Sequence, residues 1–239
     1  MTGAPHHLSH PRIERLPSMD AQPDRPPGIF ADRIDMNDPS HIEHWHKKLD
    51  CSEETLREAV SQVGDKVAEI LPGGGYFTRL LSLAVGPSGA VYAAMPAADL
   101  AKATAKGNVT PIALSPASFA TPQPVDLMFT AQNYHDFHLK RLNLDVAQVN
   151  KALLSAIKPG GVLLVIDHAA VAGAPLEVAD TLHRIDPAKA RAELEAAGFK
   201  YEGELGVLRN PADDKTKGVF DASIRGKTDQ FVYKFRKPA

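Results

Sequence analysis

The feature that most constrains this chain is an alternation of strand-like and helix-like segments that begins at Val67. Short apolar runs rich in β-branched residues, such as 67–71 and 162–166, alternate with longer segments whose apolar residues recur at helical spacing. This alternation is typical of a parallel sheet whose strands are joined by crossover helices. The 239 residues are enough for one such domain and a small appendage.

The individual segments can be assigned from their periodicity and from the turns between them. Strands are predicted over residues 67–71, 91–94, 109–114, 126–130, 162–166, 199–205 and 230–235. Helices are predicted over 76–85, 97–105, 145–157 and 187–197, with Pro–Gly turns over 86–89 and 158–161. The sequence therefore predicts an α/β domain over residues 66–239.

The chain before this domain differs in composition. Residues 1–29 are rich in proline and histidine and poor in apolar residues, so we expect a disordered tail. In residues 30–65, Ile42, Trp45 and Leu49 share one helical face, and a second helix follows over 52–63. We interpret residues 30–65 as a helical hairpin appendage, and this segment resembles a short bacterial domain of unknown function.

Charge, cysteine content and hydropathy exclude several classes of protein. A formal net charge of -2 gives no electrostatic reason to expect nucleic acid or an anionic membrane as a partner. Cys51 is the single cysteine, so no disulfide can form within the chain. The N-terminus lacks the pattern of a signal peptide, and no apolar run reaches the ~20 residues of a membrane helix. We expect a soluble cytoplasmic protein that acts on a small molecule; the oligomeric state is left open.

Residues 67–78 form the most informative motif, a strand followed by a glycine turn and a helix start. Glycines in such a turn let the backbone approach a ligand and place a helix N-terminus beside it. A dinucleotide-binding turn needs a third glycine where Thr78 stands, and an acid about 20 residues further on, which is missing. Glu69, two-thirds along the strand, is instead typical of methyltransferases. A turn with no ligand remains the alternative at this point.

Six further segments narrow the choice of family. They are Leu71 to Arg79, Gln132 to Asp136, Ile166 to His168, Thr181 to Pro187, Arg209 to Asp214 and Ile224 to Phe231. Together they resemble a family of bacterial predicted class I methyltransferases over residues 67–238. The resemblance implies a Rossmann-like class I methyltransferase fold, a seven-stranded, mostly parallel sheet with an antiparallel last strand. It also implies S-adenosylmethionine as cofactor, but no methyl acceptor.

The resemblance also implies where the cofactor binds. The expected contacts are Glu69, Pro72, Gly73, Gly74, Gly75, Tyr76, Met95 and Asn133. Most class I methyltransferases end their second strand with an acid that accepts both ribose hydroxyls, and that position is Met95 here. A thioether is only a weak acceptor, so we expect weak cofactor binding. Because of this difference, one alternative function is that of a non-enzymatic methyltransferase relative that binds a ligand or a partner. A less favoured alternative is an NAD(P)-dependent oxidoreductase.

Candidate catalytic residues follow the fourth and fifth strands, at the edge where open α/β sheets bind ligands. His135 has the ordinary pKa of a general base, and Tyr134 or Asp136 is expected to orient it or the acceptor. His168, at the end of the fifth strand, is expected to face His135. A polar loop without chemistry is the alternative.

Two other groups of polar residues have less specific interpretations. The spacing of His135, Asp136, His138 and His168 matches no compact metal motif, so we expect no metal site. Asp186 precedes Pro187 as a helix cap, and Arg184 is a candidate ligand for a substrate carboxylate. The long link that contains residues 209–214 and 225–229 is expected to form a lid or a wall of the acceptor site.

Overall fold

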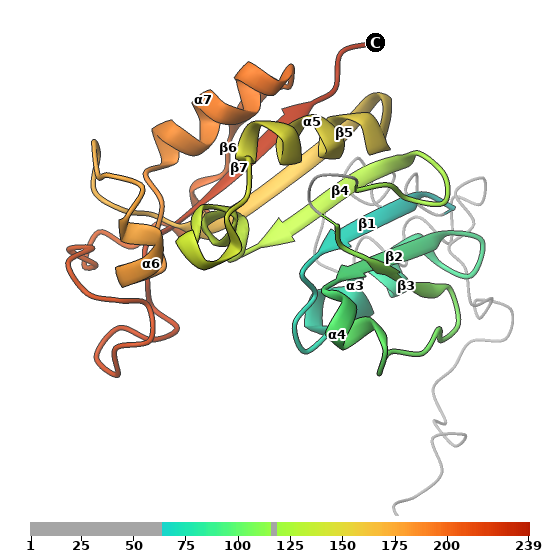
Figure 1. Cartoon of the computed structure of the whole chain (residues 1–239), viewed down its shortest axis with the longest axis horizontal. Coiled ribbons are helices and arrows are strands. Elements are labelled where there is room, and N and C mark those ends of the chain that lie inside the picture. The colour runs from blue at the N-terminus through green and yellow to red at the C-terminus, as the bar shows by residue number, and fades with distance from the viewer. Residues whose placement is uncertain (1–63, 116–118) are drawn as a thin grey trace, which may run out of the picture. The chain divides into compact units, whose positions relative to one another are not determined.

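The computed structural model describes residues 64–115 and 119–239. Their strands form one sheet in the order β3-β2-β1-β4-β5-β7-β6 (Figure 1). The strands are β1 Lys66–Ile70, β2 Ala90–Met95, β3 Val109–Ala113, β4 Val125–Ala131, β5 Ile157–His168, β6 Lys200–Glu204 and β7 Gln230–Arg236. The pairs from β3 across to β5 are parallel, whereas β7 is antiparallel to both β5 and β6. This topology confirms the predicted seven-stranded, mostly parallel sheet with an antiparallel last strand.

The helices between these strands cover the two faces of the sheet. They are α3 Tyr76–Val85, α4 Ala97–Leu100, α5 Val146–Ala156, α6 Val178–Leu182 and α7 Pro187–Ala197. Short 3-10 helices are η2 Tyr134–His138, η3 Lys140–Leu142 and η4 Gly206–Leu208. Helices α5 and α7 lie side by side on one face (Figure 1).

Alternate residues of β1 supply two separate cores. Ala68 and Ile70 of β1 belong to the larger core, which also contains Leu153 of α5 and Leu194 of α7. Val67 faces the other way and packs with α3 and β2 in a small cluster. Successive side chains of a strand point to opposite faces, so one apolar run serves both cores. This is why the central strands β2 and β5 contain continuous runs of apolar residues in the sequence.

Two predicted segments differ from the observed ones. The helix expected over 97–105 is only Ala97–Leu100, and its first three residues are exposed. A helix this short with almost no buried face gains little from packing, so it ends early. The turn expected over 158–161 belongs to the start of β5, where Ile157 pairs with Val125 and Gly160 has a φ of 75°. The register between β4 and β5 shifts next to this pair, between Val125 and Leu127, at a β-bulge.

Helices α3 and α7 have their predicted bounds, and the ends of the other elements lie within five residues of the predicted ones. Asp145 caps α5 by accepting a hydrogen bond from Gln148, and Asp186 caps α7 by accepting one from Ala188. The cap predicted for Asp186 and Pro187 is therefore confirmed, whereas α6 and the 3-10 helices were not predicted. Residues 1–29 and nearly all of the hairpin segment 30–65 lie outside the described residues. Among the described helices, none combines the length and apolar composition that a membrane crossing needs.

Candidate functional site

The glycine turn after β1 presents backbone to the carboxyl edge of the sheet. Gly73 and Gly75 have φ angles of 50° and 73°, in the left-handed region that glycine adopts without strain. Leu71 also has a positive φ, 56°, which is unusual for an apolar residue with a Cβ. Gly74 differs from its neighbours because its φ is not in that region, and a Cβ on it would meet no atom within 4 Å. Open space therefore adjoins the backbone of Gly74.

Glu69 connects the strand before the turn to the helix after it. Its buried carboxylate accepts a 2.5 Å hydrogen bond from the Thr78 hydroxyl on α3. Burial raises the pKa of Glu69 above 4.5, and the hydrogen bond only partly opposes this. Thr78, which stands where a dinucleotide turn has a glycine, thus fixes the two ends of the turn relative to each other.

Two clefts meet at the turn and share Pro72 and Gly73. The larger has a volume of about 720 Å³ and extends from Gly74 and Gly75 past Met95, at the end of β2, to residues 109–111 in the first part of β3. The smaller, of about 240 Å³, lies between the ends of β1 and β4. The turn is thus the common wall of two clefts that meet at the carboxyl end of β1.

Met95 lies at the end of β2, as predicted. It is the last residue of β2 that pairs with β3, opposite Ala113, and it lines the larger cleft. No carboxylate lines that cleft in the described part of the chain, whereas Arg79 and Lys106 do. The position expected to hold a ribose-binding acid is therefore occupied by a thioether, and no acid among the described residues that line the cleft replaces that group.

Asn133 and Tyr76 have different relations to the clefts. The Asn133 side chain donates hydrogen bonds to the carbonyls of Leu71 (3.1 Å) and Ala131 (2.6 Å), which ties the end of β1 to β4. Asn133 and Glu69 both line the smaller cleft. Tyr76 is 61% exposed and lines neither cleft. Except for Tyr76, the residues predicted to contact the cofactor therefore lie together around the two clefts.

His135, on η2 after β4, is held by a buried aspartate. Its Nδ1 lies 2.8 Å from Oδ1 of Asp167, and its backbone N–H donates to Oδ2 of the same carboxylate at 2.7 Å. His135 is 3% exposed and Asp167 is fully buried. Burial lowers the pKa of His135, but Asp167 and Asp136 outweigh this effect, and the pKa is raised overall. An aspartate that fixes one ring nitrogen leaves the other, Nε2, for chemistry.

His168 lies beside His135 but in a different environment. Their ring centroids are 6.1 Å apart, so the two predicted histidines do approach each other. His168 Nδ1 lies 2.7 Å from the hydroxyl of Thr228. Burial lowers the pKa of His168 to about 4, and the charges of His135 and Arg184 act in the same direction. His168 is therefore neutral at physiological pH.

Tyr134 does not join this group. It is fully buried in the larger core, where its hydroxyl donates to Glu193 of α7 (2.9 Å) and accepts from Asn150 of α5 (2.8 Å). Burial raises its pKa well above 10.0, and the charge of Glu193 adds to this. The catalytic role predicted for Tyr134 is replaced by a structural one, because its hydroxyl links the two helices over the sheet.

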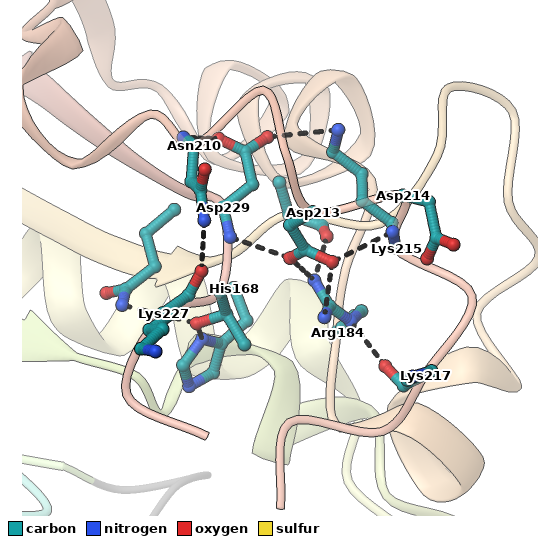
Figure 2. A network of polar contacts seen from close by, with 12 residues as sticks. His168, Arg184, Asn210, Asp213, Asp214, Lys215, Lys217, Lys227 and Asp229 are labelled. Atoms are coloured by element: carbon teal, nitrogen blue, oxygen red, sulfur yellow. Dashed lines mark hydrogen bonds and ion pairs between the residues drawn. The ribbon is translucent and has the colours of Figure 1, made fainter. Parts of the chain in front are cut away.

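Arg184 is also placed differently from its prediction. Its guanidinium is fully buried and makes two hydrogen bonds to Asp213, at 2.8 and 3.2 Å (Figure 2). It also donates to the carbonyls of Ala169 and Lys217. With these partners, Arg184 has no exposed surface for a substrate carboxylate. The pair instead fastens the link between β6 and β7 to the end of β5.

The rest of that link is fixed by the same network. The backbone N–H of Asp229 donates to Asp213 at 2.7 Å, and that of Asn210 donates to Asp229 at 2.8 Å (Figure 2). Ala169, just after β5, donates to the carbonyl of Asp229. The two polar segments of the link, predicted to form a lid or a wall, therefore meet each other beside His168.

Solved structures with the same architecture come from several organisms. A SAM dependent methyltransferase from Aquifex aeolicus is 24% identical over 83% of this chain and 98% of its own, with a TM-score of 0.50. The N-methyltransferase NodS from Bradyrhizobium japonicum is 15% identical over 85% of this chain and 100% of its own, also at 0.50. The chain has the Rossmann-like fold of S-adenosylmethionine-dependent methyltransferases.

The methyltransferase fold is also found in a solved protein that is named for another reaction. The [4+2]-cyclase SpnF is 16% identical over 78% of this chain and 81% of its own, with a TM-score of 0.53. A family model, the protein of unknown function DUF3606, matches residues 31–71. This match confirms the resemblance noted for the N-terminal segment. No curated protein matches the sequence.

Two residues of the histidine site were not identified from the sequence. Asp167 was noted only as part of the end of β5, and His183 only as part of the segment before α7. Both lie within segments that carry the methyltransferase resemblance, but their roles depend on distances between β4, β5 and α6. Those distances are not encoded in any local spacing.

Proposed function

We propose that the protein is an S-adenosylmethionine-dependent methyltransferase that acts on a small-molecule acceptor. The observation that carries this proposal is the pair of clefts that meet at the glycine turn, on the carboxyl edge of a methyltransferase sheet. Ligands of open α/β sheets bind at this edge. A cleft of about 720 Å³ is also within the range of small-ligand sites, roughly 300–1,000 Å³.

The residues around the turn fit the cofactor in most respects. The free space beside Gly74 admits a ligand close to the backbone, and Asn133 holds the β4 end of the smaller cleft against the turn. Met95 offers an apolar surface that suits an adenine ring, since thioethers pack well on aromatic groups. The missing ribose acid is the one difference, and it lowers affinity rather than blocking the site.

His135 is the residue that we assign to the acceptor. Bound S-adenosylmethionine supplies an activated methyl group, so the protein mainly has to align an acceptor and remove its proton. With Nδ1–H bonded to Asp167, His135 presents a basic Nε2. The raised pKa makes this nitrogen a better proton acceptor than that of His168. Asp136, which is 3.3 Å from Nε2, is placed to stabilise the positive charge of the protonated ring.

A second candidate is a relative that binds an adenosyl compound or another ligand without methyl transfer. The specific observation in its favour is that none of the described residues lining the cleft around Met95 carries a carboxylate. The similarity in fold to a protein named as a cyclase is consistent with this candidate. The same missing acid argues against an NAD(P) oxidoreductase, whose ribose contact needs it.

Thermal melting of the full chain tests whether an adenosyl compound binds, which the methyltransferase and an adenosyl-binding relative both require and a nicotinamide-dependent enzyme does not. A ligand that binds the native state stabilises it by about 2.7 kcal/mol at a concentration of 100 times its Kd. We expect S-adenosylmethionine and S-adenosylhomocysteine to raise the Tm and NADH and NADPH to leave it unchanged. A shift with a nicotinamide cofactor alone would contradict the proposal. No shift with any of the four would contradict it as well and favour a protein that binds a different ligand.

A further inference from the structure

Three polar side chains from two separate segments converge next to the proposed acceptor position. His135 and Asp136 lie on η2 after β4, and His183 ends α6. One coordinating atom from each lies within 4.8 Å of the others. The ring centroid of His183 lies 5.5 Å from that of His135 and 5.0 Å from that of Phe220. The three donors are therefore close enough to share one ion.

The hydrogen bonds of His135 determine which nitrogen faces this cluster. Asp167 already accepts the backbone N–H groups of His135 and His168, so it acts as an acceptor toward Nδ1 as well. Nδ1 therefore carries the hydrogen, and Nε2 has a lone pair 3.3 Å from Oδ1 of Asp136. Two lone pairs at this distance repel each other unless a proton or a metal ion lies between them. A histidine that donates its other N–H to a carboxylate is also the usual arrangement of a metal ligand.

We propose that Nε2 of His135, the Asp136 carboxylate and a ring nitrogen of His183 bind one divalent transition-metal ion of the zinc class. Two imidazoles and one carboxylate suit such an ion, and three protein ligands leave a position open for a further group. The inference rests on the proposed function, because that open position faces the place assigned to the acceptor.

The ion changes the role of His135 within that function. An acceptor hydroxyl or thiol that binds at the open position loses its proton to water, since the metal stabilises the anion. The anion then forms a bond to the methyl carbon as the bond from that carbon to the sulfonium sulfur breaks. The products are the methylated acceptor and S-adenosylhomocysteine, and His135 acts as a ligand rather than as the base. The acceptor is therefore expected to carry an oxygen or sulfur that binds metal.

The neighbouring histidines provide matched controls. His168 directs Nδ1 to Thr228, and His138 binds Glu193 through Nε2 at 3.0 Å, so neither is part of the cluster. The chain has 10 histidines, six of which precede residue 64 and can bind metal on their own. The experiment therefore has to compare variants of the full chain rather than rely on total metal content.

The test is a cobalt titration of the full-length chain after removal of metal by a chelator. Cobalt replaces zinc and gives visible absorption bands whose intensity depends on its ligands. We expect His183→Asn and Asp136→Asn each to remove one equivalent of bound cobalt, or to weaken that equivalent at least tenfold. His138→Ala is expected to match the wild type. Asparagine is chosen for His183 because it tolerates the positive φ of 53° at that position.

Binding of S-adenosylhomocysteine, measured on the same samples, separates this inference from the function on which it rests. Equal cobalt binding by the wild type and both asparagine variants would overturn the metal site, whether or not the adenosyl compound binds. A cobalt equivalent lost in both variants would support the metal site even where the adenosyl compound fails to bind. In that case only the methyltransferase proposal would be contradicted.

Discussion

The two halves of the sheet are built in different ways. On the β1–β3 side, the larger cleft is lined by the glycine turn, by Met95 and by exposed cations such as Lys106, and among the described residues that line it only Thr78 is a buried polar side chain. On the β4–β7 side, Asp167, His135, His168, Arg184 and Asp213 are all buried and bonded to one another or to the chain around them. All of the buried polar side chains described except Glu69 and Thr78 lie on this second side.

This difference indicates where the protein is pre-organised. A buried polar network is stabilising only when its members are satisfied, and it then fixes one geometry. The β4–β7 side therefore holds its histidines in place before any ligand binds. The β1–β3 side depends on backbone shape, so we expect its ligand to be held less strongly. The predictions below test the two sides separately.

Removal of Arg184 is expected to have the largest effect. Arg184→Met leaves the buried Asp213 carboxylate without its guanidinium, and breaking a buried pair in this way destabilises by roughly 3–5 kcal/mol. Lys140→Met is the control, since its pair with Glu177 is 3.9 Å long and largely exposed, and such pairs contribute about 0–1 kcal/mol. Urea denaturation measures both. A loss below about 1 kcal/mol for Arg184→Met would mean that the network does not hold the link in place.

Removal of His135 is expected to affect turnover more than cofactor binding. His135→Ala removes the group assigned to the acceptor, and the rate should fall about 100-fold or more. Affinity for S-adenosylhomocysteine should stay within about twofold, because His135 lines neither cleft. The measurement needs an acceptor, and His138→Ala serves as the control. An unchanged rate would move the acceptor role to His168 or away from the histidines.

The charge of Asp213 is expected to make stability depend on pH. Burial alone would raise its pKa, but hydrogen bonds from Asp229, Arg184 and Lys215 hold the pKa below 3.8. The unfolded chain therefore takes up this proton first as the pH falls below 3.8, and the free energy of unfolding decreases until the folded-state pKa is reached.

Asp213→Asn abolishes this titration, so its free energy of unfolding should fall less steeply below pH 3.8 than that of the wild type. Denaturation at several pH values measures the slopes, with Asp180→Asn as an exposed control. Identical slopes for Asp213→Asn and the wild type would show that Asp213 is not held ionised by these bonds.

A smaller effect is expected on the β1–β3 side. Met95→Asp restores a carboxylate at the end of β2, and hydrogen bonds to a charged group contribute about 1.5–3 kcal/mol. We expect the Kd for S-adenosylmethionine to fall from tens of micromolar by about tenfold or more. Calorimetry on both proteins checks this. Tighter binding by the wild type than by Met95→Asp would place the ribose elsewhere.

The same two sides differ in how far they could be predicted from the sequence. The sheet, the glycine turn and the position of Met95 followed from periodicity and from a turn whose chemistry is local. Asp167 and His183 could not be assigned roles, because they act on His135 across three elements. Tyr134 and Arg184 were misjudged for the same reason: a polar residue beside a candidate site gives no indication in the sequence of which way it faces. The range predicted for α4 was too long because its alanines favour a helix, whereas the segment has almost nothing to pack against.

The central claim is that the glycine turn binds the adenosyl cofactor, and calorimetry on Gly74→Val tests it most directly. A Cβ at Gly74 meets no protein atom, so the variant is expected to fold with the stability of the wild type. Its valine nevertheless enters the space assigned to the ligand. We predict that Gly74→Val binds S-adenosylhomocysteine at least about tenfold more weakly than the wild type, and that Gly206→Val, in η4, binds it like the wild type. A folded Gly74→Val with wild-type affinity would contradict the account.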